Sequence, residues 1–391
     1  DVDSVRILGV NDGINGSVAL VEDGILRFAL QEERFTGVKE HIGFPYLAME
    51  RILRIAGLQP EDIDEMALAT KYVTFSPGVE GHTAGMSIQQ KLKDIAPAFF
   101  GIYEDNVPMV KERHPELFRL FEQGRNVRRL AAIRKRSHYW GKITVIDHHI
   151  AHAAAAYYCS PWRDDVLVMT ADASGDGLCA TVNVGNGGTF RRIARTVHTN
   201  SLGYLYTGVT GFMGMKQHSH EYKVMGLAPH APEKSVQKPY DVFRSYIDLD
   251  GLEFQRKIPE PLHHVKPRLK NDLYMVRFDA VAAGLQRLTE ELMVQWVARA
   301  VERTKLSKVV GGGGVFMNVK VSKLIRERPY IDGFFPMPSA GDESTSIGAA
   351  QWLYAERMRE QGSELRGKPL GPLYLGDEPT EKEIETEVMT L

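Results

Sequence analysis

The chain has 391 residues, of which 43% are hydrophobic and 25% are charged, and its formal net charge is −2. This length exceeds that of most single compact cores, so two lobes are expected. The near-zero charge argues against a protein that binds nucleic acid through bulk positive charge. No apolar run approaches the ~20 residues that a membrane-spanning helix needs.

The two cysteines, Cys159 and Cys179, are too few for a disulfide framework and form no CxxC motif. The acidic first residues lack the order of a signal peptide. We therefore expect a reducing compartment, with the cytoplasm as the default location. Neither nucleic acid nor a membrane is expected as a partner.

The N-terminal region predicts a meander of three antiparallel strands. Residues 6–10, 17–21 and 25–30 are rich in apolar and β-branched side chains, and glycine-containing turns separate them. The first of these turns, residues 11–16, carries Asp12. An amphipathic helix and a buried strand are then expected at 47–56 and 66–69.

Between about residues 76 and 136 prolines interrupt short helical pieces. This pattern predicts a helical insertion in the first lobe. The basic end of the insertion, residues 125–136, is interpreted as a solvated face rather than as an anion site.

A histidine-rich segment follows the strand predicted at residues 142–146. Asp147 is a favourable N-cap residue and the next alanines favour helix, so strand, cap and helix are expected in that order. On this helix His148 and His152 lie on one face, where two imidazoles can hold one metal ion. His149 points elsewhere. The alternative is an exposed helix start that is rich in histidine, and the spacing alone does not decide between the two.

The opening pattern returns after residue 162. Strands are expected at 166–169, 178–184 and 190–194, again with glycine turns between them. The repetition predicts an internal duplication, with two similar lobes facing each other across a cleft. The expected divisions are a first lobe at 1–162, a second lobe at 163–366 and a linker toward a further domain at 367–391.

Helices at 204–213, 281–304 and 343–361 and a strand at 308–310 complete the second lobe. The long insertion near 76–136 is the natural place for loops that shape an acceptor pocket, because variable loops carry specificity.

The two acidic turns place Asp12 and Asp172 at equivalent points of the two lobes. Backbone N–H groups in such turns can bind phosphate oxygens, and an aspartate beside them can hold a metal or a water. Two ordinary hairpin turns are the equal alternative. Gly312 and Gly313, in a run of four glycines before Asn318, leave the backbone open to a nucleoside, whereas the alternative is a flexible turn.

Three further residues are candidates that have ordinary structural alternatives. Asp342 is a favourable N-cap for the last helix, yet it also offers the carboxylate that would complete a site for Fe(II), Zn or Mn. Lys223 is a candidate phosphate contact, with a surface lysine as the alternative. His41 is a candidate acid or base, with a solvated loop histidine as the alternative.

Several segments together resemble the NodU/CmcH family of O-carbamoyltransferases. They occur in the expected order from residue 6 to about residue 376. The chain departs from the family pattern in the first lobe, where Ile14 and Asn15 stand in place of the expected histidine and aspartate. The segments that carry the resemblance are residues 31–35, 147–153, 201–203, 221–228, 311–318 and 339–343.

The resemblance implies a duplicated α/β fold of actin-like (RNase H-like) lobes, similar to the sugar kinases and to the tRNA threonylcarbamoyl transferase. It implies a divalent metal held by His148, His152 and Asp342, with Fe(II) favoured over Zn or Mn. His149 would then lie behind the metal or face the substrate, and together with Lys223 and His41 it is predicted to be catalytic. Lys223 would contact phosphate.

The donor implied by the resemblance is carbamoyl-adenylate, which a C-terminal YrdC-like domain of the family makes from ATP and carbamoyl phosphate. The acceptor would be a hydroxyl group of a small natural product or sugar. Two alternatives stay open: a nucleotide-binding partner protein without activity, and a sugar-kinase-like ATPase of the same fold.

Overall fold

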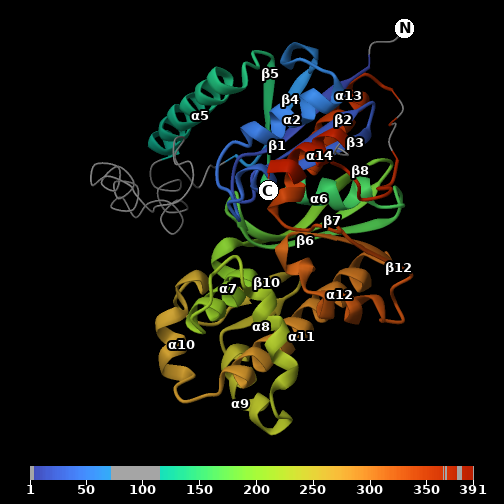
Figure 1. Ribbon diagram of the computed structural model, residues 1–391. Coiled ribbons are helices and arrows are strands. Elements are labelled where there is room, and N and C mark those ends of the chain that lie inside the picture. The colour runs from blue at the N-terminus through green and yellow to red at the C-terminus, as the bar shows by residue number, and fades with distance from the viewer. Residues whose placement is uncertain (1–3, 72–114, 364, 366–367, 377–380, 391) are drawn as a thin grey trace.

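The computed structural model describes residues 4–71, 115–363, 365, 368–376 and 381–390. Within them, two five-stranded sheets form the cores of two lobes (Figure 1). Every helix in this part of the chain is too short or too polar to span a bilayer.

The first sheet has the strand order β3-β2-β1-β4-β5. β1 pairs with β2 and β2 with β3 in antiparallel fashion, which confirms the predicted meander. β4 and β5 extend the sheet on the other side of β1 as parallel strands. The strands are β1 (Arg6–Asn11), β2 (Ser17–Glu22), β3 (Ile25–Gln31), β4 (Glu65–Ala69) and β5 (Lys142–Ile146).

The second sheet has the order β12-β11-β6-β7-β8, which is the same topology when the strands are counted from β6. The predicted duplication and the actin-like α/β fold are therefore confirmed. A small ribbon of two strands lies apart from both sheets. The strands are β6 (Val166–Gly175), β7 (Leu178–Asn186), β8 (Thr189–Val197), β11 (Lys308–Gly312) and β12 (Gly333–Pro336), with β9 (Ile247–Asp250) and β10 (Glu253–Arg256) in the ribbon.

β6 is longer than predicted. It continues to Gly175 through the segment that we interpreted as a turn, so Asp172 belongs to the strand. The register with β7 shifts between Ala171 and Gly175, and this irregularity leaves Asp172 outside the paired ladder. Such a bulge redirects a side chain without ending the strand.

Helices α6 (His148–Cys159) and α13 (Thr345–Glu360) pack against each other between the two sheets. α6 follows the strands of the first sheet but lies on β6, β7 and β11 of the second. α13 follows the strands of the second sheet but lies on β1, β2 and β4 of the first. α6 lies before the division predicted near residue 162 and α13 lies after it, yet each helix packs on the sheet of the other lobe.

The two helices approach so closely because small residues line their contact. A Cβ atom at Gly348 of α13 would collide with the carbonyl oxygen of Ala151 in α6. Ala154 and Ala155 beside it are fully buried. Gly9 of β1 likewise leaves room for the backbone of Ser346. Close packing of this kind tolerates no added volume.

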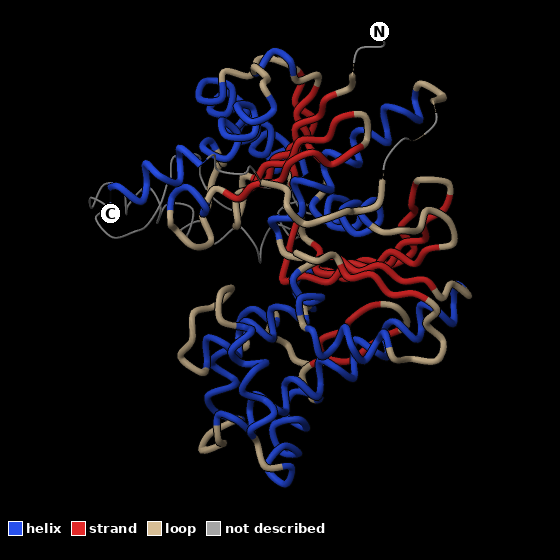
Figure 2. The backbone as a smooth tube through the Cα atoms, turned by 45° about the vertical axis from the view of Figure 1, so that its right-hand side comes forward, coloured by secondary structure: helices blue, strands red, loops and turns tan. Residues whose placement is uncertain are grey.

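The remaining helices cover the outer faces, and in Figure 2 most of those of the second lobe lie below the second sheet. The predicted helices at 47–56, 204–213 and 281–304 are present with slightly shifted ends. They are α1 (Glu33–Thr36), α2 (Tyr46–Ala56), α5 (Pro115–Ser137), α7 (Leu202–Phe212), α8 (Glu221–Leu227), α9 (Glu233–Arg244), α10 (Lys266–Asp272), α11 (Phe278–Thr304), α12 (Val319–Arg326) and α14 (Glu381–Thr390), with short 3-10 turns η1 (Pro60–Asp62), η2 (His198–Asn200), η3 (Ala228–His230), η4 (Leu262–His264), η5 (Gly314–Met317) and η6 (Asp342–Ser344).

Two predicted segments, the helical insertion and the C-terminal linker, lie partly outside the described residues. Of the helical insertion near 76–136, residues 76–114 lie outside the described residues, and the rest is α5. The segment after α13, predicted as a linker, returns along both lobes. The N–H of Leu370 donates to the carbonyl of Cys159, and the N–H of Ala29 in β3 donates to the carbonyl of Leu375, both at 2.9 Å.

The contact between α6 and α13 predicts the effect of adding one methyl group. Gly348→Ala should lower the free energy of unfolding by about 1–3 kcal/mol, because the two backbones must separate. Gly226→Ala is the matched control, since a Cβ atom at this helical glycine meets nothing within 4 Å. It should be neutral or stabilising by up to about 1 kcal/mol. Chemical denaturation measures both, and equal effects would contradict the prediction.

Candidate active site

Two carboxylates fix the start of α6, which carries the histidines. The side chain of Asp147 accepts a hydrogen bond from the N–H of Ile150 at 3.2 Å, as expected for an N-cap. The carboxylate of Asp176, from the turn after β6, accepts from the N–H of His148 at 2.7 Å. These bonds satisfy free N–H groups of the first turn and set the position of His148.

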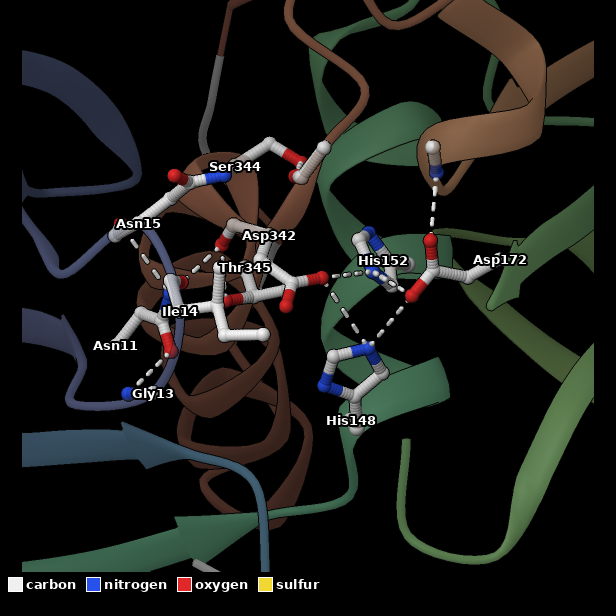
Figure 3. A network of polar contacts seen from close by, with 12 residues as sticks. Asn11, Gly13, Ile14, Asn15, His148, His152, Asp172, Asp342, Ser344 and Thr345 are labelled. Atoms are coloured by element: carbon white, nitrogen blue, oxygen red, sulfur yellow. Dashed lines mark hydrogen bonds and ion pairs between the residues drawn. The ribbon is translucent and has the colours of Figure 1, made fainter. Parts of the chain in front are cut away.

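Four side chains converge at this point (Figure 3). His148 and His152 come from α6, Asp172 from β6 and Asp342 from η6. One ligand atom of each lies within 4.8 Å of the other three. Nε2 of His148 is 3.5 Å from both carboxylates, and Nε2 of His152 is 3.3 Å from Asp342 and 3.9 Å from Asp172. The three residues predicted as metal ligands are thus brought together, and Asp172 joins them.

The donor set fits a divalent cation. Nε2 of His148 and Nε2 of His152 are buried and make no hydrogen bond of normal geometry to any described residue. Four ligands held about 2.1 Å from one ion lie about 3.4 Å from one another, which is close to the observed nitrogen–oxygen separations. Two imidazoles and two carboxylates are ligands that Zn, Mn and Fe(II) accept.

The charges of the cluster are coupled. Burial alone would lower the pKa of His148, but the carboxylates of Asp342 and Asp172 outweigh it and raise that pKa to about 9. Burial would raise the pKa of Asp172, but the nearby imidazoles of His148 and His152 lower it instead. Without a cation, a proton on His148 balances the carboxylates. A bound metal would take the place of that proton.

The ring of His148 and the carboxylate of Asp172 are each held from behind. Nδ1 of His148 lies 3.1 Å from the hydroxyl of Thr70, at the end of β4. The N–H of Gly314 donates to Oδ1 of Asp172 at 2.9 Å, which leaves Oδ2 facing the histidines. Gly175 has no side chain where a Cβ atom would strike the ring of His148. Such supporting contacts orient metal ligands.

His149 lies behind the cluster, against β6 and β7. It is fully buried, and its Nδ1 is 2.8 Å from the hydroxyl of Thr170, which in turn contacts the hydroxyl of Thr181 at 2.7 Å. Burial and the positive charge of His148 and His152 lower the pKa of His149 to about 3, so the ring is neutral. The predicted catalytic role of His149 stays a prediction.

A cavity of about 270 Å³ opens beside the cluster in the second lobe. Asp172 belongs to both, so the cavity reaches the candidate ligands. Asn318, predicted to bind a nucleotide, lines the cavity and is held by a reciprocal pair of amide hydrogen bonds with Gln286, at 2.9 and 3.0 Å. The walls otherwise come from Ala173, Leu202, Gly203, Tyr206, Thr207, His218, Ser219, Glu221, Tyr222, Met225, Thr289, Gly314, Val315 and Met317.

The other predicted glycines do not line this cavity. Gly312 faces the carbonyl of His152, and a Cβ atom there would lie 2.6 Å from that oxygen. Gly313 has a positive φ of 93° and faces the backbone of Ala171. The glycines therefore let β11 approach α6 and β6 closely, while Gly314 is the member of the run that borders the cavity.

The structure places Lys223 and His41 away from the four ligands. Lys223 is exposed on α8, with Nζ 3.0 Å from Nε2 of His220, and it is not among the lining residues. His41 is buried rather than solvated, and burial lowers its pKa. Glu40 beside it forms a 2.8 Å ion pair with Lys216 of the other lobe. Roles for Lys223 and His41 in catalysis stay predictions.

Asp12, the counterpart of Asp172 in the first lobe, is paired with Arg129 of α5. Nε of Arg129 donates to Asp12 at 2.7 Å, Nη2 donates to its other carboxylate oxygen, and Nη1 donates to the carbonyl of Thr70 at 2.9 Å. Both charged side chains are buried. The interpretation of the whole basic end of the insertion as a solvated face is therefore wrong at Arg129, because a buried carboxylate needs a counter-charge.

These contacts also show what the sequence reasoning missed. Arg129 joins Asp12 to Thr70, and Thr70 contacts the candidate ligand His148. No local pattern marks Arg129 among the arginines of α5. For Asp172 the glycine-rich repeat was a usable signal, because it allowed for an aspartate that holds a metal beside a phosphate turn, but it did not place Asp172 with the histidines.

Comparison with known proteins identifies the family. Residues 6–351 match the family described as "Carbamoyltransferase N-terminus". The chain belongs to this family.

Three relatives illustrate the similarity. An uncharacterized protein of Synechocystis is 29% identical, over 97% of this chain and 62% of its own length. The nodulation protein NolNO of Sinorhizobium fredii is 25% identical, over 96% of this chain and 51% of its own length. An uncharacterized protein of Methanocaldococcus jannaschii is 24% identical, over 88% of this chain and 56% of its own length. This chain therefore spans between about half and two thirds of the length of these relatives.

Solved structures resemble it more distantly. The activator of the 2-hydroxyisocaproyl-CoA dehydratase from Clostridium difficile is 13% identical with a TM-score of 0.44, over 93% of this chain and 99% of its own. Full-length HypF is 12% identical with a TM-score of 0.45, over 90% of this chain and 56% of its own. The fold assignment rests on the duplicated sheet order and not on these likenesses.

The buried ion pair predicts a large effect for Arg129→Ala. This substitution leaves the carboxylate of Asp12 buried without its partner, so the free energy of unfolding should fall by about 3–5 kcal/mol. Arg128→Ala is the control, because Arg128 is exposed on the same helix, and its effect should stay within about 0.5 kcal/mol. Urea unfolding of both variants checks the difference. A loss below about 1 kcal/mol for Arg129→Ala would contradict the burial of this pair.

The donor set predicts a single site for a divalent metal. Protein treated with a chelator should take up about one equivalent of Zn or Co(II), and His152→Ala should weaken this binding at least ~100-fold, because a ligand is lost. Asp172→Ala should also weaken this binding if Asp172 is a ligand, and should not if Asp172 only lies beside the site. His230→Ala, an exposed histidine, is the control. Unchanged dissociation constants in the first two variants would refute the site.

Proposed function

We propose that this member of the carbamoyltransferase family transfers a carbamoyl group from carbamoyl-adenylate to a hydroxyl group of a small natural product or sugar. The observation that carries the proposal is the cluster of two histidines and two aspartates at the edge of the cavity, in a chain whose match to the family covers residues 6–351.

The cavity suits the adenylate part of such a donor. Its lining combines apolar and aromatic side chains with a few polar groups, as expected for a small-molecule site. Tyr206 and Tyr222 are among the lining residues, and aromatic side chains of this kind suit a heteroaromatic base. Asn318 is fixed by Gln286 and by its own cap to the N–H of Val321, so its polar atoms are preorganised. Gly314 leaves the backbone open beside Asp172.

The phosphate and carbamoyl groups would then lie toward the cluster. His148, His152, Asp172 and Asp342 would hold a divalent metal, for which Fe(II) is favoured and Zn or Mn are the other candidates. When bound, such an ion neutralises negative charge on phosphate and carbonyl oxygens. The chain orients the groups that would hold the metal. The start of α6 fixes the histidines, and the N–H of Gly314 binds Oδ1 of Asp172, so that Oδ2 faces them.

The reaction balances without a redox partner. The acceptor oxygen forms a bond to the carbamoyl carbon, and the bond from that carbon to the phosphate oxygen breaks. AMP leaves with the electron pair of that bond, and the hydroxyl proton is released. The products are the O-carbamoylated acceptor and AMP. ATP and carbamoyl phosphate would supply the donor through a YrdC-like domain of the whole protein.

Supplied carbamoyl-adenylate separates this activity from its alternatives. The wild type should release AMP and form a carbamate on at least one member of a panel of sugars and hydroxylated natural products, detected by mass spectrometry. Asp342→Ala should lower the rate at least ~100-fold, because a ligand is lost from the metal that would neutralise negative charge on the reacting oxygens. His230→Ala should keep the wild-type rate.

Other outcomes would favour other functions. Tight binding of a stable adenylate analogue in calorimetry, without turnover on any acceptor, would favour a nucleotide-binding partner protein. A phosphorylated acceptor formed from ATP would favour a kinase. Equal rates for the wild type and Asp342→Ala would contradict a role for the cluster in the transfer.

A further inference from the structure

The side chain of Asn11 joins the two lobes at the candidate metal site. Asn11 ends β1 and is buried, with 2% of its surface exposed. Its Oδ1 accepts from the N–H of Gly13 at 3.0 Å, and its Nδ2 donates to the carbonyl of Ile14 at 2.7 Å. These bonds close the turn of the first lobe. The same Nδ2 donates to the main-chain carbonyl of Asp342 at 3.1 Å (Figure 3).

Asp342 therefore has two fixed sides. Its carbonyl oxygen accepts from Asn11, from the hydroxyl of Thr345 at 2.6 Å and from the main-chain N–H of Thr345. Its carboxylate points the opposite way, toward His148 and His152 (Figure 3). Because the side chain of an aspartate has only two rotatable bonds, the direction of this carboxylate follows the placement of its backbone.

The other three members of the cluster are held differently. His148 and His152 belong to α6, which lies on the second sheet, and Asp172 belongs to β6 of that sheet. The first lobe reaches His148 through its ring, at Thr70, and not through its main chain. Asp342 is the member whose main chain is hydrogen-bonded to the turn after β1. A metal site assembled from both sides needs this fourth group at the correct distance, and a shift of a few tenths of an ångström changes coordination.

We propose that Asn11 is a positioning residue that holds Asp342 in place for metal binding. The inference rests on the metal site proposed above and adds a residue that touches neither the metal ligand atoms nor the cavity. Its amide is suited to the task, because it supplies an acceptor for its own turn and donors for the carbonyls of that turn and of Asp342.

Ser17 offers a matched control at the same junction. Its hydroxyl is buried and donates to the carbonyl of Glu343 at 2.8 Å, the residue after Asp342. Ser17→Ala thus removes a bond between the same two segments without touching the carbonyl of Asp342. If Asn11 acted only through the general stability of this junction, Ser17→Ala would have the same consequences as a change at Asn11.

The test is a titration of the metal-free full chain with Co(II), followed by its visible absorption spectrum. In Asn11→Ser a hydroxyl remains to accept from the N–H of Gly13, but it is too short to reach Asp342. We expect Co(II) to bind roughly 10–100-fold more weakly than in the wild type, with a changed ligand-field spectrum, as for other residues that support a ligand. Ser17→Ala should bind within about twofold of the wild type and keep its spectrum.

Thr345→Val guards against a variant at Asn11 that does not fold. It removes the hydroxyl that also donates to this carbonyl, and it leaves the turn of the first lobe and the main-chain N–H of residue 345 in place. It should also weaken binding of Co(II), and an unchanged affinity would overturn the proposal. The proposal is also overturned if Asn11→Ser folds and matches Ser17→Ala in affinity and spectrum. That result would not contradict the metal site itself. Failure of the wild type to bind Co(II) would overturn both the site and the inference.

Discussion

The close contact between α6 and α13 decides where this protein can do chemistry. Gly348 leaves room for the carbonyl of Ala151, and further along Cys159 of α6 contacts Gln351 of α13, so the helices run in the same direction. Their N-termini therefore lie together. His148 opens one helix, and Asp342 lies just before the other. Two helix N-termini at one point favour negative charge, whether it belongs to carboxylates or to a phosphate.

The equivalent aspartates of the two lobes, Asp12 and Asp172, have different partners. Asp172 faces two histidines at the edge of the cavity, whereas Asp12 is neutralised by Arg129. A buried carboxylate has to find a counter-charge in either case. In the second lobe the partners are groups that can exchange a proton for a metal, and in the first lobe the partner is a permanent cation. The equivalent position therefore carries the candidate chemistry in one lobe and contributes to stability in the other.

Local patterns were enough for most strands of the two sheets, for α6 and for placing His148 and His152 on one face of it, because these depend on residues close in sequence. They missed β9, β10 and β12 and ended β6 too early. Asp342 could not be assigned from spacing, and only the family resemblance placed it with the histidines. Arg129 was misinterpreted because its partner is 117 residues away and its neighbours are exposed. The sequence also could not predict that α6 packs on the second sheet and α13 on the first. The pattern of apolar residues shows that a helix face is buried, but not against which sheet.

The departure from the family pattern at Ile14 and Asn15 has a consequence for the first lobe. Neither residue titrates near neutral pH, and Asp12, the acid of the same turn, is engaged by Arg129. The turn is instead organised by amide hydrogen bonds from Asn11, which also reach the main chain of Asp342. If Asn11 positions Asp342 as proposed, the contribution of this turn to the site is geometric. For the proposed transfer we then expect the group that accepts the hydroxyl proton to come from another segment of the protein or from water.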